Sequence, residues 1–502
     1  MASPLKKLVG QTAIYGLSSI LGRLLNYALT PLYTSAHVFS TDQYGIITEM
    51  YAYVAFLVVL LMYGMETAFF RFYSDTDNKG KVYSTALWSL LVTTFTFIAV
   101  VSVFAQPISN YLGYPNHSEY VSWFGIIVGL DALIAIPLAK LRAENKALKF
   151  AGINFSFIGI NIGLNLFFLW YCLPNYQAGT TNWLIDAVYN PEIGVGYVFI
   201  SNLIASTVRF LMMLPDMLKI ELSFDKVLWK KMLRYGAPLL IVGLAGIINE
   251  TLDKPLLKWI LIPTLGEEKA MSQVGIYGGI YKLSIAITLF VQAYRYAAEP
   301  FFFDQKKTDG SKETYAQMLH LFTAFVLFAF LVITLFIDVF KHFLQSEEYW
   351  EGLGVVPMLL LANIFLGIYY NLSVWYKLTD KTIYGSYLAI TGAVITIGLN
   401  VWLIPIIGYR GSALATLVCY FTMASVSYLV GQRHFKVPYS LPKLALFFGL
   451  ALGIYYAHSL LEFSNVIVMY AIRIGMICLY LAIVALVEFI PKRKNVHIDS
   501  NH

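Results

Sequence analysis

Long apolar segments recur along the whole of this 502-residue chain and limit the folds that it can adopt. A helix needs about 20 apolar residues to cross the hydrocarbon core of a bilayer. Fourteen segments meet that length: residues 12–34, 44–66, 83–106, 120–139, 151–173, 193–214, 236–262, 274–299, 315–337, 353–376, 383–404, 411–431, 442–461 and 466–490. Because 58% of all residues are hydrophobic and only 13% are charged, a soluble globule is excluded. We therefore expect an all-α polytopic membrane protein with fourteen transmembrane helices.

Basic residues predict the orientation of these helices. Lysine and arginine gather in every second loop, for example between 219 and 234, whereas the other loops hold only Lys269, Lys341 and Arg410. Since basic loops stay on the cytoplasmic side, we expect both termini to be cytoplasmic. The first apolar segment follows Lys6 and Lys7 but does not suit a cleaved signal peptide. We expect it to be retained as the first helix of a protein of the cell (inner) membrane.

An internal repeat predicts two halves of like architecture. The run that begins at Leu141 matches the run that begins at Tyr376 at a constant offset of 235 residues, so that Ile162–Asn165 meets Ile397–Asn400. The fifth helix then corresponds to the eleventh, which indicates two six-helix lobes of the same orientation. The expected domains are an N-lobe at 1–215, an amphipathic cytoplasmic linker at 216–235, a C-lobe at 236–432, two further helices at 433–490 and a cytoplasmic tail at 491–502.

The seventh segment, residues 236–262, carries charges at membrane depth. Each charge at the centre of a membrane helix costs roughly 2.5–3.5 kcal/mol. At about 100° per residue, Glu250, Lys254 and Lys258 fall on one side of a continuous helix, with Asp253 at its edge. We expect that side to face a water-filled cavity or partner charges. The first helix has a similar polar side, which includes Arg23 and Asn26.

Candidate site residues follow from this pattern. A cavity between two lobes that holds cations would bind an anionic head group. The candidates for substrate binding are Arg23, Asn26, Asn249, Lys254, Lys258 and Lys282, and those for ion coupling are Glu250 and Asp253. A salt bridge within the cluster is an equal alternative for the acids, and pairing with nearby acids is the preferred interpretation for Arg209 and Arg295, near the ends of their helices.

Enzymatic chemistry has no support in the sequence. It contains no phosphate-binding GxxxxGK[ST] loop, no HExxH motif and no Ser-His-Asp candidate. Its three cysteines, Cys172, Cys419 and Cys478, lack the spacing of a metal site. We expect no enzymatic activity, no metal, no cofactor other than a gradient of Na⁺ or H⁺, and no nucleic-acid partner.

Three local strings give the chain a resemblance to a known family. They are YGMETAFFRF from Tyr63, AEPF from Ala298 and YRGSALAT from Tyr409. Together with the two lobes, they resemble the polysaccharide transporter (oligosaccharide flippase) family of the MOP superfamily, which also contains MATE exporters and lipid II flippases. Arg23 corresponds to a first-helix arginine of lipid II flippases, whereas Lys254 and Lys258 are local variations.

The resemblance implies a function. Two lobes would face each other across a central cavity and rock by alternating access. They would move an undecaprenyl-diphosphate-linked oligosaccharide from the inner to the outer leaflet, for the synthesis of lipopolysaccharide or another cell-surface polysaccharide. Its expected partners are this lipid-linked substrate, membrane lipids and other polysaccharide assembly proteins.

Three functions other than that of an oligosaccharide flippase can be weighed against the same sequence features. A MATE-type multidrug/cation antiporter would need a cavity dominated by acids and aromatics. A glycosyltransferase or O-antigen polymerase would need a large outer loop with catalytic residues, and the longest outer loop, at 174–192, is short. An uncoupled lipid scramblase shares every feature named above.

Overall fold

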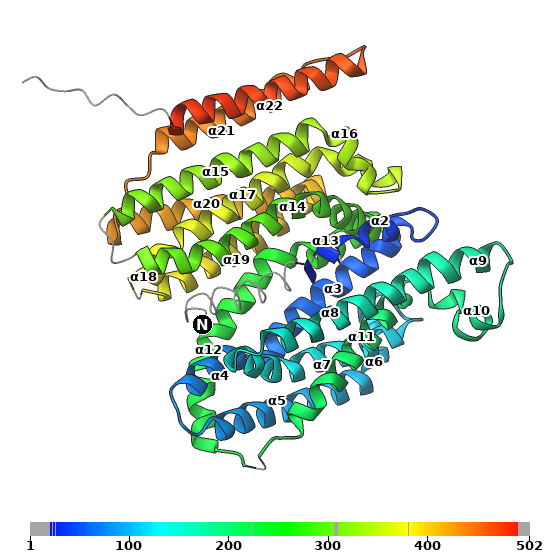
Figure 1. Ribbon diagram of the computed structural model, residues 1–502. Helices are drawn as coiled ribbons and strands as arrows, with labels where there is room; N and C mark the ends of the chain where they lie inside the picture. Colours follow the sequence, from blue (N-terminus) through cyan, green and yellow to red (C-terminus); the bar gives the residue numbers. More distant parts are fainter. Residues whose placement is uncertain are drawn as a thin grey trace, which may run out of the picture.

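The protein is an all-helical membrane protein, shown in Figure 1 as a computed structural model. The structure describes residues 21–22, 24–25, 27–221, 223–305, 310–379 and 381–489, and this part of the chain contains no strand. Thirteen of its helical segments are long and apolar enough to cross a membrane. The expected all-helical, membrane-spanning architecture is therefore confirmed. The expected number of fourteen spans is approximate, because the first expected span, at 12–34, lies largely outside the described residues.

The described part of the first lobe contains five candidate membrane spans and their connections. Its elements are α2 (Thr30–Tyr33), α3 (Thr41–Met62), α4 (Met65–Ser74), α5 (Lys79–Val103), α6 (Ala105–Leu112), α7 (Ser118–Ala143), α8 (Ala147–Asn165), the π-helix η1 (Leu166–Cys172), α9 (Leu173–Gln177), α10 (Trp183–Val188), η2 (Pro191–Ile193) and α11 (Gly196–Met217). In Figure 1 this lobe is the bundle coloured from blue through cyan to green that ends with α11.

The second lobe lies beside the first and carries two more helices on its far side (Figure 1). Its elements are α12 (Lys226–Thr251), α13 (Asp253–Leu265), α14 (Glu267–Gln305), α15 (Ser311–Leu335), α16 (Ile337–Phe340), η3 (Lys341–Phe343), η4 (Glu347–Val355), α17 (Val356–Leu372), α18 (Val374–Leu378), α19 (Ile383–Ile407) and α20 (Tyr409–His434). The last two helices, α21 (Leu441–Ser459) and α22 (Val466–Phe489), pack on α15.

The repeat seen in the sequence recurs in the packing. In the first lobe α11 packs against α7 and α8, and in the second lobe α20 packs in the same way against α17 and α19. Asn165 and Asn400, which the repeat aligns, are both fully buried. Each donates its side-chain amide to the carbonyl four residues earlier, at 2.7 Å for Asn165 and 2.8 Å for Asn400. The two lobes are therefore two copies of one helical arrangement.

The seventh span is broken in its middle. The helix α12 ends at Thr251 and α13 begins at Asp253. Pro255 explains the break, because it lacks an amide hydrogen for the carbonyl of Thr251 and its ring crowds that carbonyl. The expected linker at 216–235 is not a separate segment along its whole length. Helix α12 begins at Lys226, after an N-cap in which the Asp225 carboxylate accepts from two backbone amides. The second half of that stretch is therefore the first part of the spanning helix.

The two lobes meet closely where α3 crosses α14. A Cβ atom on Gly45 would lie 2.2 Å from the carbonyl oxygen of Met271, and one on Gly275 would lie 1.8 Å from that of Thr41. Only glycine permits this approach of the two backbones. The Thr41 and Ser272 hydroxyls also bond across the contact at 2.8 Å. We call these four residues and Met271 the seam.

The seam lies at the end of the bundle opposite the basic loops. In Figure 1 the α4–α5 turn, the start of α12 and α18 lie at one end, whereas α2, α13 and α16 lie at the other. The first of these ends carries the ion pair of Lys81 with Asp225, at 3.0 Å. We call it the basic end, and it is the end predicted to be cytoplasmic. The seam therefore closes the lobes together on the predicted outer side.

Candidate substrate cavity

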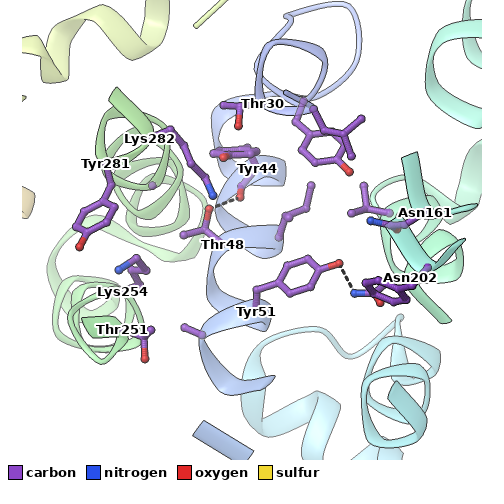
Figure 2. Close-up of a pocket in the computed structure, with 17 residues that line it drawn as sticks. Thr30, Tyr44, Thr48, Tyr51, Asn161, Asn202, Thr251, Lys254, Tyr281 and Lys282 are labelled. Carbon is purple, nitrogen blue, oxygen red and sulfur yellow. Dashed lines mark hydrogen bonds between the residues drawn. The ribbon is translucent and has the colours of Figure 1, made fainter. Parts of the chain in front are cut away.

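A central cavity of about 370 Å³ lies between the lobes. Helices α2, α3, α8 and α11 of the first lobe line one side, and α12, α13 and α14 line the other (Figure 2). Its polar lining residues are Thr30, Tyr33, Tyr44, Thr48, Tyr51, Asn161, Asn202, Thr251, Lys254, Tyr281 and Lys282. No acidic residue lines it within the part of the chain that the structure describes. The cavity is therefore polar, aromatic and positively charged.

Two of the predicted lysines line this cavity. Figure 2 shows Lys282 reaching from α14 toward Thr48 on α3. Its ammonium has no ion-pair or hydrogen-bond partner among the described residues. Lys254, on α13, donates to the carboxylate of Asp253 at 2.9 Å and to the carbonyl of Glu250 at 3.2 Å. Its ammonium also lies 4.6 Å from the ring centroid of Tyr281. Among the described residues, Lys282 therefore has no compensating charge, whereas Lys254 is partly compensated by Asp253.

Hydrogen bonds fix the neutral wall opposite the lysines. Tyr51 accepts from the Asn202 side-chain amide at 2.8 Å, and Tyr33 donates to Asn165 at 2.7 Å (Figure 2 shows the first of these). Thr48 donates back to the carbonyl of Tyr44 at 3.0 Å. These bonds hold the tyrosine rings and amides of the first lobe in place around the cavity. The wall therefore offers neutral hydrogen-bonding groups and aromatic faces to a ligand.

The break in the seventh span separates residues that one straight helix would align. Glu250 and Asn249 do not line the central cavity but a second cavity of about 590 Å³, between α12 and helices α17, α19 and α20. The side-chain amide of Asn249 bonds to the Ala389 carbonyl at 3.2 Å and accepts from Thr396 at 3.2 Å. Glu250 is exposed in this second cavity and forms no ion pair among the residues described.

Asp253 lies at the break itself and is only 3% exposed. One of its carboxylate oxygens accepts from Lys254, and the other accepts from the Tyr277 hydroxyl at 2.7 Å. Both oxygens thus have a partner inside the protein. Asp253 holds Lys254 at the edge of the cavity, which is the salt-bridge alternative that the sequence left open.

Lys258 is not a cavity residue, which corrects our sequence-based placement. Its side chain and that of Glu49 are fully buried and form an ion pair at 2.9 Å. The same ammonium donates to the Leu112 carbonyl at 2.5 Å and to the Tyr114 hydroxyl at 3.2 Å, and Tyr114 in turn donates to Glu49. The break in the helix and the partner on α3 together seal Lys258 in a dry contact between the lobes. It does not line the central cavity.

Arg23 and Asn26 lie outside the described residues, and their role in the cavity stays a prediction. Sequence reasoning missed the neutral wall, because tyrosines at membrane depth serve packing as often as binding. Asn161 carried the best signal, since it lies one turn before Asn165 in the repeated segment.

Comparison with solved structures shows which class of proteins shares this fold. The chain is similar to the lipid II flippase MurJ in an inward closed conformation, with a TM-score of 0.69 and 16% identity over 94% of this chain and 97% of that one. It is also similar to an inward-facing multidrug resistance MATE family transporter of the MOP superfamily, with a TM-score of 0.63 and 15% identity over 82% and 94%. A MOP superfamily transporter from Pyrococcus furiosus gives 0.55 and 16% over 84% and 95%. The fold is therefore that of MOP superfamily transporters.

The sequence defines the family more closely. Residues 36–351 match the model of a family described as polysaccharide biosynthesis protein, and the chain belongs to this family. No match was found among curated proteins. The resemblance inferred from the local strings is thus confirmed at the level of the family, and the fold is one that MOP superfamily transporters share.

Proposed function

We propose that this protein is a flippase for an undecaprenyl-diphosphate-linked oligosaccharide. It carries the lipid from the inner to the outer leaflet of the cytoplasmic membrane, with both termini in the cytoplasm. The family and the fold support a lipid-linked flippase or transporter of the membrane. The choice of a diphosphate lipid rests on the chemistry of the central cavity.

The observation that carries this proposal is the pair Lys254 and Lys282 in a cavity lined by no acid among the described residues. A diphosphate presents several anionic oxygens, and lysine binds phosphate strongly as a point charge. No carboxylate among the described lining residues competes for Lys282, so its charge is available to the ligand. Hydrogen bonds to charged groups contribute about 1.5–3 kcal/mol each, which corresponds to roughly 10- to 150-fold in affinity.

Two closures between the lobes support a mechanism of alternating access. The seam and the Lys258–Glu49 pair hold the predicted outer side shut. Opening on that side and closing at the basic end would expose the cavity to the outer leaflet while the lipid tail stays in the bilayer. We propose a gradient of H⁺ or Na⁺ as the source of direction, with Glu250 as the coupling acid because it lacks an ion-pair partner among the described residues.

A multidrug or cation antiporter is the second candidate function, because MATE transporters share the fold. A cationic drug would meet Lys254 and Lys282 in the central cavity, and like charges repel there. The charge of the cavity therefore favours an anionic substrate. In the MOP superfamily transporter from Pyrococcus furiosus, a reverse polarity of the binding pocket likewise suggests a different function.

Flipping in proteoliposomes tests the proposal. The purified protein is reconstituted with fluorescent undecaprenyl-diphosphate-linked oligosaccharide, and the fraction moved to the other leaflet is measured with and without a gradient of H⁺ or Na⁺. We expect Lys282→Ala and Lys254→Ala to lower the rate about tenfold or more at subsaturating lipid. The exposed Lys381→Ala is the matched control and should keep the wild-type rate.

Two outcomes would overturn parts of the proposal. Equal rates for wild type and both cavity variants would remove the diphosphate-binding role of the lysines. Flipping that is independent of either gradient, and unchanged in Glu250→Gln, would identify an uncoupled scramblase.

A further inference from the structure

The second cavity has a chemistry different from that of the central one. It measures about 590 Å³ and lies within the second lobe, between α12 and helices α17, α19 and α20. Five tyrosines line it: Tyr235, Tyr369, Tyr370, Tyr376 and Tyr420. Neither Lys254 nor Lys282 reaches it, and Arg234 is the one basic residue among its described lining residues.

This lining suits a neutral, hydroxyl-rich ligand. Tyrosine presents a flat apolar face and a polar hydroxyl, and Thr382 and Ser386 add two further hydroxyls. A sugar ring has the complementary form, with apolar C–H faces and a rim of hydroxyl groups. A prenyl chain would leave the hydroxyls of Thr382 and Ser386 without a hydrogen-bond partner among the described residues, and a diphosphate would find a carboxylate, Glu250, in the same cavity.

The two cavities adjoin at the break in the seventh span. Glu250 lines the second cavity and Thr251, its neighbour in the chain, lines the central one. Lys254 bridges the same point, because its ammonium donates to the Glu250 carbonyl at 3.2 Å. A lipid whose diphosphate is bound at Lys254 would therefore have its first sugars beside the end of α12, close to Glu250, which lines the tyrosine-lined cavity.

Space for a ligand is maintained by a glycine on α12. Gly246 lines the second cavity, and a Cβ atom added to it would meet no atom within 4 Å. A larger side chain at this position would project into the cavity without displacing protein atoms near the backbone. Replacing a helical glycine also favours the helix by roughly 0.5–1 kcal/mol, so such a variant is expected to fold.

We propose that the second cavity is a glycan-binding compartment, which holds the oligosaccharide while Lys254 and Lys282 hold the diphosphate. This inference rests on the proposed function and deepens it, because it divides recognition of one substrate between two cavities. Specificity for the sugar then lies in the tyrosine-lined cavity, and affinity for the lipid diphosphate in the central one.

Binding of two probes tests this division. The probes are undecaprenyl diphosphate and the same lipid carrying the oligosaccharide of the producing cell, each measured against the full-length protein in lipid nanodiscs. We expect Gly246→Leu to weaken binding of the glycosylated lipid about tenfold or more and to leave undecaprenyl diphosphate within about twofold. Tyr370→Ala should act in the same direction. Gly449→Leu is the control, since Gly449 on α21 also has open space at its Cβ.

The outcomes separate this inference from the proposed function. If Gly246→Leu and Tyr370→Ala bind both probes as the wild type does, or weaken both equally, the glycan-binding compartment is refuted. Lys282→Ala should weaken both probes. If wild type binds neither probe, or if Lys282→Ala binds both normally, the proposed diphosphate site fails regardless of the result at Gly246.

Discussion

Removing the charge of Lys258 should open the outer side of the protein. The Lys258–Glu49 pair is fully buried between α13 and α3, and all three ammonium hydrogens have acceptors: Glu49, the Leu112 carbonyl and Tyr114. Deleting one partner of a buried ion pair costs about 3–5 kcal/mol, because the remaining charge is left uncompensated in a dry site. When the lobes separate, water reaches Glu49 and that cost is largely removed.

The expected shift is large enough to measure. A cost of about 3–5 kcal/mol in the closed state alone changes the ratio of closed to open protein by roughly two to three and a half orders of magnitude. We would replace the three native cysteines, introduce Ser272→Cys at the seam and follow its reaction with a membrane-impermeant maleimide. Lys258→Met should make this cysteine react much faster than in the protein with intact Lys258.

A double variant controls for loss of folding. Replacing a buried pair by apolar side chains is often neutral, so Lys258→Met with Glu49→Leu should return the thiol introduced at the seam to slow labelling. Thermal unfolding of each variant, measured in parallel, reports whether the fold is retained. The reasoning is refuted if Lys258→Met leaves that thiol as protected as before, or if the double variant labels as fast as the single one.

Three further perturbations have defined outcomes. Asp253→Asn removes the carboxylate that compensates Lys254 and should tighten binding of undecaprenyl diphosphate several-fold; weaker binding in a filter assay would contradict this. Gly275→Val places atoms inside the backbone of α3 and should lower the melting temperature or open the seam, whereas Gly163→Val, which has open space, should do neither. Arg473→Ala breaks a bond of 2.7 Å to the carboxylate of Asp338 on α16 and should lower the free energy of unfolding by about 1–3 kcal/mol; an unchanged denaturation midpoint would argue against it.

The sequence predicts the membrane architecture well because its signals are repeated many times. Each span has its own run of apolar residues, and the basic loops alternate along the chain. The duplicated segments provide a second, independent signal. Asn165 and Asn400 are aligned by the repeat alone, and in the structure they make the same bond to the carbonyl four residues earlier.

The site was predicted only in part, because helical periodicity assumes a straight helix. The break before Pro255 sends Glu250 and Lys254 into different cavities, although a continuous helix would place them on one side. Lys258 was misplaced for a second reason. Its partner Glu49 is 209 residues away in the chain, and no local pattern indicates that two such charges meet.

The position of a bound diphosphate tests the central claim most directly. An experimentally determined structure of the full-length protein with undecaprenyl diphosphate would locate the two phosphorus atoms. We predict phosphate oxygens within hydrogen-bonding distance of the ammonium groups of both Lys254 and Lys282, in the central cavity between the lobes. Phosphate density elsewhere, with both lysines unoccupied, would contradict the account.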